Sequence, residues 1–155
     1  MPNGTGFSGK VEPVSTLDAI SVETEPFVDI NDGSGAQAIL REIERLLEHL
    51  IDNGEEGVID IKTIPLSLHE HEQLHYVLGR GELTATLNSM GKSIVHETAI
   101  AGVWRTIHYN DDGDVIADLI EVTTLPEILK SDLTDMQNAL DELRKRIETE
   151  QPLIV

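Results

Sequence analysis

Three histidines and a glutamate near the middle of the chain have the clearest potential for chemistry. They are His69 and, two residues on, the segment His71-Glu72-Gln73-Leu74-His75. This segment matches H-E-x-x-H, in which two histidines one helical turn apart grip zinc and the glutamate acts as general base. One candidate function is therefore a small metal-binding protein or a metal-dependent hydrolase.

The surrounding sequence argues against catalysis at this segment. A catalytic zinc needs a third protein ligand held by supporting structure, and nothing downstream of His75 suggests one. The helix is also short, because Gly79-Arg80-Gly81 ends it soon after His75. We expect no catalytic residue and no cofactor, and favour a polar, solvent-facing helix side. His69, His71 and His75 remain candidates for adventitious nickel or zinc binding, since imidazole suits both metals.

A second set of histidines and glutamates lies on two predicted neighbouring strands. His96 and His108 have Glu97 and Glu121 nearby, from which a His–Glu acid/base pair could be built. No nucleophile or glycine-rich phosphate loop accompanies them. We therefore predict ordinary cross-strand polar pairs.

Composition excludes several other functions. The chain of 155 residues has a formal charge of -18 and no cysteine. Disulfides, cysteine-bound iron–sulfur clusters and thiol catalysis are thus excluded in this chain. Nucleic acid and anionic membrane surfaces are poor partners, because both require basic residues. The sequence has no apolar run near the ~20 residues of a spanning helix and no secretory pattern at its start, so we expect a cytoplasmic protein.

The region 79–123 is the part around which the fold is organised. Alternating or β-branched apolar residues predict four successive strands, at 82–88, 93–100, 103–109 and 114–123. Asn110-Asp111-Asp112-Gly113 is the clearest hairpin turn. The last strand has apolar residues on both faces, which predicts an interior position. Val58–Ile61 adds a short strand.

Three helices accompany this sheet. The first spans Ser34–Asn53, with Ser34 as N-cap and Gly54 after its end. A shorter helix starts at Ser67, where Ser67 and Glu70 form a capping box, and ends before Gly79. Pro126–Leu129 is a helical turn, and the final helix runs from Ser131 or Asp132 to about Glu150. Its apolar stripe consists of Leu133, Met136, Leu140, Leu143 and Ile147.

The predicted fold class is α+β: an antiparallel four- to five-stranded meander sheet with two major helices packed on one face. Residues 1–33 are predicted to form an acidic flexible N-terminal arm, and residues 34–155 a single domain. Trp104, the only tryptophan, has two interpretations. It is a core residue, or it lies with Arg105 and Tyr109 in an exposed binding strand, because Trp, Tyr and Arg dominate interface energetics.

The sheet region resembles a known family. The ordered set Gly79-Arg80-Gly81-Glu82, then Glu97-Thr98 followed by Gly102-Val103-Trp104, then Tyr109-Asn110, is similar to hydrogenase expression/formation proteins of the HupH/HyaF type. The resemblance covers their conserved C-terminal region, about residues 36–150 here.

The resemblance implies a non-catalytic, chaperone-like accessory factor in the maturation of uptake nickel–iron hydrogenase. It implies the iron–sulfur small-subunit precursor as partner, with a thioredoxin-like accessory protein as a further one. A homodimer, formed by self-pairing of the acidic helices, is a third alternative. We expect the partner-binding residues to be Gly79, Gly81, Glu82, Glu97, Gly102, Val103, Trp104, Arg105, Tyr109 and Asn110.

Overall fold

The structure is a computed structural model that describes residues 34–89 and 91–149. The element order is α1 (Gly35–Asn53), β1 (Gly57–Asp60), η1 (Ile61–Thr63), α2 (Leu68–Leu78), β2 (Thr84–Asn88), β3 (Lys92–Glu97), β4 (Val103–Tyr109), β5 (Val115–Val122), η2 (Glu127–Leu129) and α3 (Leu133–Thr149). The predicted N-terminal arm, residues 1–33, lies outside the described residues, as does the predicted helix end at Glu150.

The five strands form one antiparallel sheet in the order β1-β5-β4-β3-β2. Strands β2 to β5 are a meander, and β1 pairs with the free side of β5. The predicted α+β class and the antiparallel meander are confirmed. So is the interior position of β5 in the sheet, although its apolar residues Val115 and Ile116 are exposed while Ile120 and Val122 are buried.

The predicted helix boundaries also hold, because each depends on local capping chemistry. The Ser34 hydroxyl accepts the backbone N–H of Gln37, and Gly54 ends α1 in the left-handed conformation. At α2 the Ser67 hydroxyl accepts the N–H of Glu70, while the Glu70 carboxylate accepts the N–H of Ser67. These caps fix where the two helices begin relative to the sheet.

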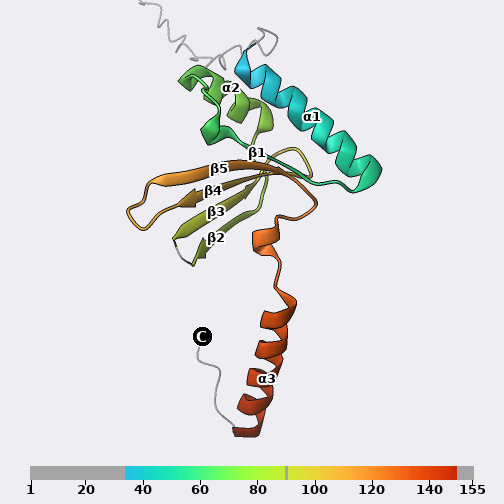
Figure 1. Cartoon of the computed structure of the whole chain (residues 1–155), viewed down its shortest axis with the longest axis vertical. Coiled ribbons are helices and arrows are strands. Elements are labelled where there is room, and N and C mark those ends of the chain that lie inside the picture. Colours follow the sequence, from blue (N-terminus) through green and yellow to red (C-terminus); the bar gives the residue numbers. More distant parts are fainter. Residues whose placement is uncertain (1–33, 90, 150–155) are drawn as a thin grey trace, which may run out of the picture.

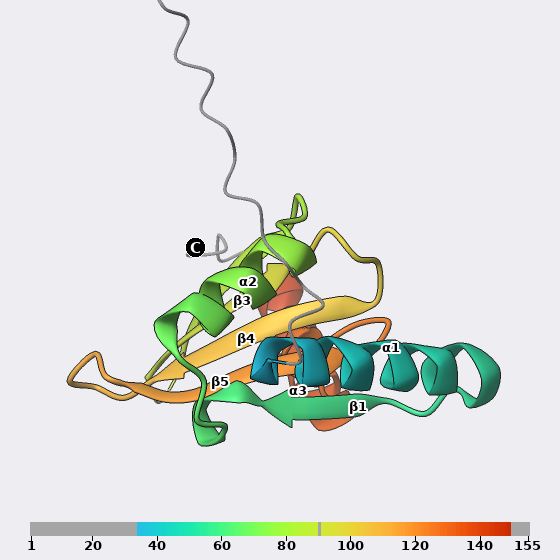
Figure 2. The ribbon, with the colours of Figure 1, turned by 90° about the horizontal axis from the view of Figure 1, so that it is seen from above.

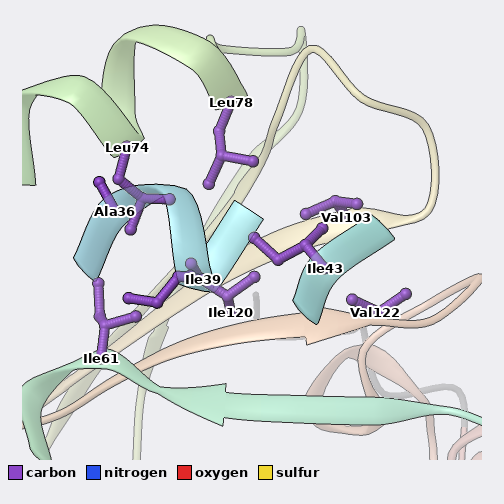
Figure 3. Packing of buried hydrophobic residues seen from close by; sticks show 9 residues of the cluster. All are labelled: Ala36, Ile39, Ile43, Ile61, Leu74, Leu78, Val103, Ile120 and Val122. Atoms are coloured by element: carbon purple, nitrogen blue, oxygen red, sulfur yellow. The ribbon is translucent and has the colours of Figure 1, made fainter. Parts of the chain in front are cut away.

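Helices α1 and α2 lie together over one face of the sheet (Figures 1 and 2). Their apolar stripes meet the inward-facing residues of β4 and β5 in one buried cluster (Figure 3). The cluster consists of Ala36, Ile39, Ile43, Ile61, Leu74, Leu78, Val103, Ile120 and Val122. Burial of these side chains holds both helices in place above the strands.

Helix α3 is arranged differently. It leads away from the sheet, and none of its residues is buried (Figure 1). The expectation that the two major helices pack on one face of the sheet is therefore not confirmed, because the long helix α3 lies away from it. The apolar stripe of α3 remains exposed, from 41% at Leu140 to 79% at Leu133.

The buried cluster makes a direct prediction about stability. Ile120 has no accessible surface, whereas Ile51 on α1 is 76% exposed. Ile120→Ala should lower the free energy of unfolding by about 2–5 kcal/mol, since it removes buried methyl groups and leaves a cavity. Ile51→Ala, the matched control, should change it by less than about 0.5 kcal/mol. Urea unfolding followed by circular dichroism measures both, and equal effects would contradict the packing described.

Candidate functional site

The loop from Gly79 to Leu83 is pressed against the end of β3. The N–H of Ala99 donates to the carbonyl of Leu78 at 2.9 Å, and the N–H of Gly81 donates to the carbonyl of Glu97 at 2.9 Å. A Cβ atom at Gly81 would lie 2.7 Å from the Thr98 carbonyl oxygen, and one at Gly79 would lie 2.8 Å from the Ala99 Cβ. Both glycines are therefore required by close approach of the chain.

The side chain of Glu97 fixes the same loop from the other side. Its Oε2 accepts the backbone N–H groups of Glu82 at 3.2 Å and Leu83 at 3.3 Å. The backbone of Glu97 also donates to the Leu83 carbonyl at 3.0 Å. A carboxylate bound by two N–H groups is a strong, charge-assisted arrangement. Glu97 therefore holds the loop through one of its two carboxylate oxygens.

The turn between β3 and β4 is locked by Thr98, whose hydroxyl donates to the Val103 carbonyl at 2.8 Å. Gly102 completes this turn with φ of +84°. Next to it, Trp104 is only 6% exposed, and its indole N–H donates to the Thr123 carbonyl at 3.1 Å. Trp104 thus ties β4 to the end of β5, and the side chain offers a partner almost no surface.

Arg105 joins an ion pair within the sheet to a hydrogen bond with α2. Arg105 on β4 donates to both carboxylate oxygens of Asp118 on β5, at 2.8 and 2.6 Å. Its remaining Nη1 lies 3.2 Å from Nδ1 of His75 on α2. Because a guanidinium can only donate, Nδ1 must accept, which fixes His75 in its neutral Nε2–H form. Arg105 therefore positions His75 and the C-terminal half of α2 over the strands.

A hollow of 460 Å³, named here the polar pocket, opens beside these residues. It lies between the C-terminal half of α2 and strands β3 and β4. Its lining consists of His75, Tyr76, Leu78, Gly79, Arg80, His96, Glu97, Thr98 and Arg105. Burial, together with the charges of Arg80 and Arg105, lowers the pKa of His96. This pocket therefore presents neutral imidazoles beside two guanidinium groups.

A second hollow of 410 Å³, named here the apolar groove, runs along α1. It is lined by Gln37, Leu40, Arg41, Ile43, Glu44, Leu47, Glu48, Ile51, Val77, Leu78 and Ile100. The groove and the polar pocket share Leu78, at the end of α2. The two hollows therefore have Leu78 as a common wall.

The predicted partner-binding residues do not form one patch. Gly79, Glu97 and Arg105 line the polar pocket, with Gly81 and Glu82 in the adjoining loop. Val103 and Trp104 are buried, and Gly102 lies at the β3–β4 turn. Tyr109 and Asn110 lie at the opposite end of β4, where the Asn110 carboxamide accepts the N–H of Asp114 and shapes the hairpin turn.

The apolar groove was missed by sequence reasoning. Its residues come from α1, α2 and the β3–β4 turn, and they occupy ordinary core-facing or helix-surface positions in the sequence. The one signal for the groove in the sequence was the large number of apolar residues on α1, which is more than the sheet covers. Ile51, at the end of that stripe, is exposed.

The histidine segment does not assemble a metal centre in the part of the chain that the structure describes. The rings of His71 and His75 stack at 6.5 Å between centroids, but no group of three or more described His, Asp or Glu residues is arranged to hold a metal ion. The Arg105 guanidinium beside His75 also disfavours a cation. His96 and His108 contact Thr84 and Ser93, directly opposite them on neighbouring strands, so the predicted cross-strand pairs are confirmed.

These features define an α+β domain with two adjoining surface hollows on a sheet-supported scaffold. Residues 34–149 match the family model described as the HupH hydrogenase expression protein, C-terminal conserved region. The chain belongs to this family.

Individual relatives agree with this assignment. The chain is 32% identical over 95 residues to the hydrogenase expression/formation protein HupH of Rhodobacter capsulatus, covering 61% of this chain and 34% of that protein. It is 27% identical over 113 residues to HoxQ of Cupriavidus necator, covering 71% and 40%. The chain thus spans between a third and two fifths of the length of these curated relatives.

A solved structure supports the fold. The hydrogenase expression protein HupH from Thiobacillus denitrificans is 40% identical and superimposes with a TM-score of 0.71, covering 74% of this chain and 95% of that one. Among the described residues, no helix is long and apolar enough to cross a membrane.

The close approach at Gly81 yields a testable prediction. Gly81→Ala should lower the free energy of unfolding by about 1–3 kcal/mol, because the added methyl group meets backbone at the Thr98 carbonyl. Arg80→Ala, one residue earlier and exposed, is the control and should change stability by less than about 0.5 kcal/mol. Chemical denaturation measures the free energy of unfolding of both variants. A Gly81→Ala variant as stable as the unsubstituted protein would contradict the close packing of this loop against β3.

His75 should titrate below the ordinary histidine value. Burial first, and the Arg105 charge second, lower its pKa from 6.5. When the pKa of a histidine is lower in the folded protein than in the unfolded chain, the unfolded chain binds the proton more tightly. The contribution of His75 to stability is therefore complete above about pH 6.5 and is lost as the pH falls toward its pKa in the folded protein. NMR titration of the imidazole signals tests this, and Arg105→Gln should raise the His75 pKa. A His75 midpoint at or above 6.5 in the unsubstituted protein would contradict the geometry.

Proposed function

We propose that this chain is a non-catalytic, cytoplasmic accessory factor that binds the iron–sulfur small-subunit precursor of a nickel–iron hydrogenase during its maturation. Family membership supports a hydrogenase maturation role. The observation that carries the binding role is the pair of adjoining hollows at Leu78, one apolar and one polar. A surface of this kind suits recognition of a client segment better than chemistry.

The apolar groove supplies the contact area in this proposal. One wall of the groove is formed by α1, through Leu40, Leu47 and Ile51. The opposite wall is formed by Val77 and Ile100. Arg41, Glu44 and Glu48 border the groove. Exposed apolar surface with a polar rim is typical of protein-binding sites, and a groove along a helix fits the apolar face of an amphipathic client segment.

The polar pocket supplies orientation. Arg80 makes no ion pair with any residue in the described ranges and is exposed at the mouth of this pocket. Arg105 is held by Asp118, so its position does not depend on the client. A client carboxylate or backbone carbonyl placed here would meet fixed donors, which gives specificity more than affinity. Gly79 and Glu97 line this pocket, and Gly81 and Glu82 lie in the adjoining loop.

Two properties of the whole chain support the same proposal. The sequence contains no cysteine, so this chain has no thiolate with which to compete for the client's cluster. Its formal charge of -18 favours encounter with a basic client segment, and that attraction weakens as salt is added. A thioredoxin-like accessory protein is a further partner that this proposal accommodates.

The apolar groove gives a matched test of client binding. Ile51 lies in the groove and is 76% exposed, while Ile116 on β5 is 55% exposed and lies outside both hollows. In hydrogenase-expressing cells, Ile51→Asp should reduce the small-subunit precursor that co-purifies with this protein by about tenfold or more. Ile116→Asp should leave recovery unchanged. Immunoblotting and mass spectrometry of the bound fraction measure both.

Three results would contradict parts of this proposal. Equal recovery with both variants, each shown to be folded, would place the client elsewhere on the surface. Recovery of the large subunit alone would keep a maturation role and overturn the client. If no hydrogenase component is recovered with the unsubstituted protein at low salt, the binding function itself fails.

A further inference from the structure

Helix α3 carries an apolar stripe with a stricter period than a core-facing helix needs. Its members, Leu133, Met136, Leu140, Leu143 and Ile147, are separated by three, four, three and four residues. All five are exposed, between 41% and 79%. An apolar repeat alternating by three and four is the a/d seam of a coiled coil, narrower than the stripe of a helix packed on a sheet.

We propose that α3 pairs in antiparallel orientation with α3 of a second copy of this chain, forming a two-helix coiled coil that joins two domains. This inference concerns a different surface from the apolar groove and the polar pocket, so it does not depend on the proposed function.

The net charge of α3 allows such pairing. The helix has four acidic and three basic side chains, whereas the whole chain carries -18. Several of these charges are paired within the helix, as in the Arg144–Asp141 and Arg146–Glu142 ion pairs. Self-association at α3 therefore avoids most of the repulsion that two acidic domains would experience if they met elsewhere.

The charged positions beside the seam favour the antiparallel orientation. With Leu133 at position a, Asp132 and Arg146 fall at g, while the e positions are Gln137 and Arg144. When Leu133 lies opposite Leu143 of the second copy, and Met136 opposite Leu140, Asp132 of each helix lies near Arg146 of the other. Parallel pairing would bring g beside e, where none of these residues makes an opposite-charge pair.

The shape of the molecule favours the same orientation. The sheet and its two helices are at the N-terminal end of α3, and the rest of α3 extends away from them (Figure 1). Paired helices lie about 8–10 Å apart. Parallel pairing would place two five-stranded sheets side by side at the same end. Antiparallel pairing places them at opposite ends of a rod about 25 Å long.

Sedimentation of the isolated full chain tests the association. A monomer–dimer equilibrium is expected, and Leu140→Asp, at the centre of the seam, should weaken it by at least about tenfold. Asn138→Asp, on the opposite side of the same helix, is the control and should leave the dissociation constant unchanged. Since α3 has no buried residue, both variants should stay folded by circular dichroism. A monomer at every concentration, or a dimer insensitive to Leu140→Asp, would overturn the proposal.

Disulfide trapping tests the orientation, because the natural chain contains no cysteine to interfere. Under mild oxidation, a mixture of Leu133→Cys and Leu143→Cys proteins should form heterodimeric disulfides. Neither variant alone should cross-link, because like positions at these ends lie about 15 Å apart in the antiparallel register. Efficient cross-linking of either variant alone would show a parallel pair. The absence of any cross-link would overturn the proposal that a second copy of this chain pairs with α3. Packing of α3 against its own sheet, or binding of α3 only to a hydrogenase subunit, would overturn it as well.

Discussion

The architecture depends on the clamp between the Gly79–Leu83 loop and the end of β3. Glu97 accepts two N–H groups of this loop, and its backbone exchanges further hydrogen bonds with Gly81 and Leu83. This clamp fixes where α2 ends, and Arg105 fixes how α2 lies over the strands through His75. Once α2 is held, α1 can pack beside it over β4 and β5. The apolar groove and the polar pocket exist only because these two helices are fixed relative to the sheet.

The residues that carry the family resemblance are therefore mainly structural. Gly79 and Gly81 permit the close approach, Glu97 and Thr98 hold the loop and the turn, and Trp104 joins β4 to the end of β5. Conserved-looking motifs can identify a family through its scaffold while the contact surface lies elsewhere. The contact surface proposed for this protein is formed largely by helix residues with no distinctive local pattern.

Much of the fold was predictable, because it follows from local chemistry. Ser34, Ser67 and Gly113 mark helix starts and a hairpin turn through capping and backbone preferences that operate over a few residues. The order of β2 to β5 follows from short turns between antiparallel neighbours, whereas the pairing of β1 with β5 joins segments far apart in the sequence. The apolar groove was not predictable, since Leu47, Val77 and Ile100 are far apart in sequence and meet only in the folded chain. The exposure of α3 was missed because an apolar stripe on a helix does not itself show which surface covers it.

In the proposed function, a hydrogenase precursor binds across the apolar groove and the polar pocket. Hydrogen–deuterium exchange of the full chain, with and without purified small-subunit precursor, would locate the bound surface. We expect slower exchange in residues 40–51 of α1 and in residues 75–83 when the precursor is bound, with no change at the hairpin turn 110–114. Unchanged exchange in both regions, with protection confined to the hairpin turn or to α3, would contradict it.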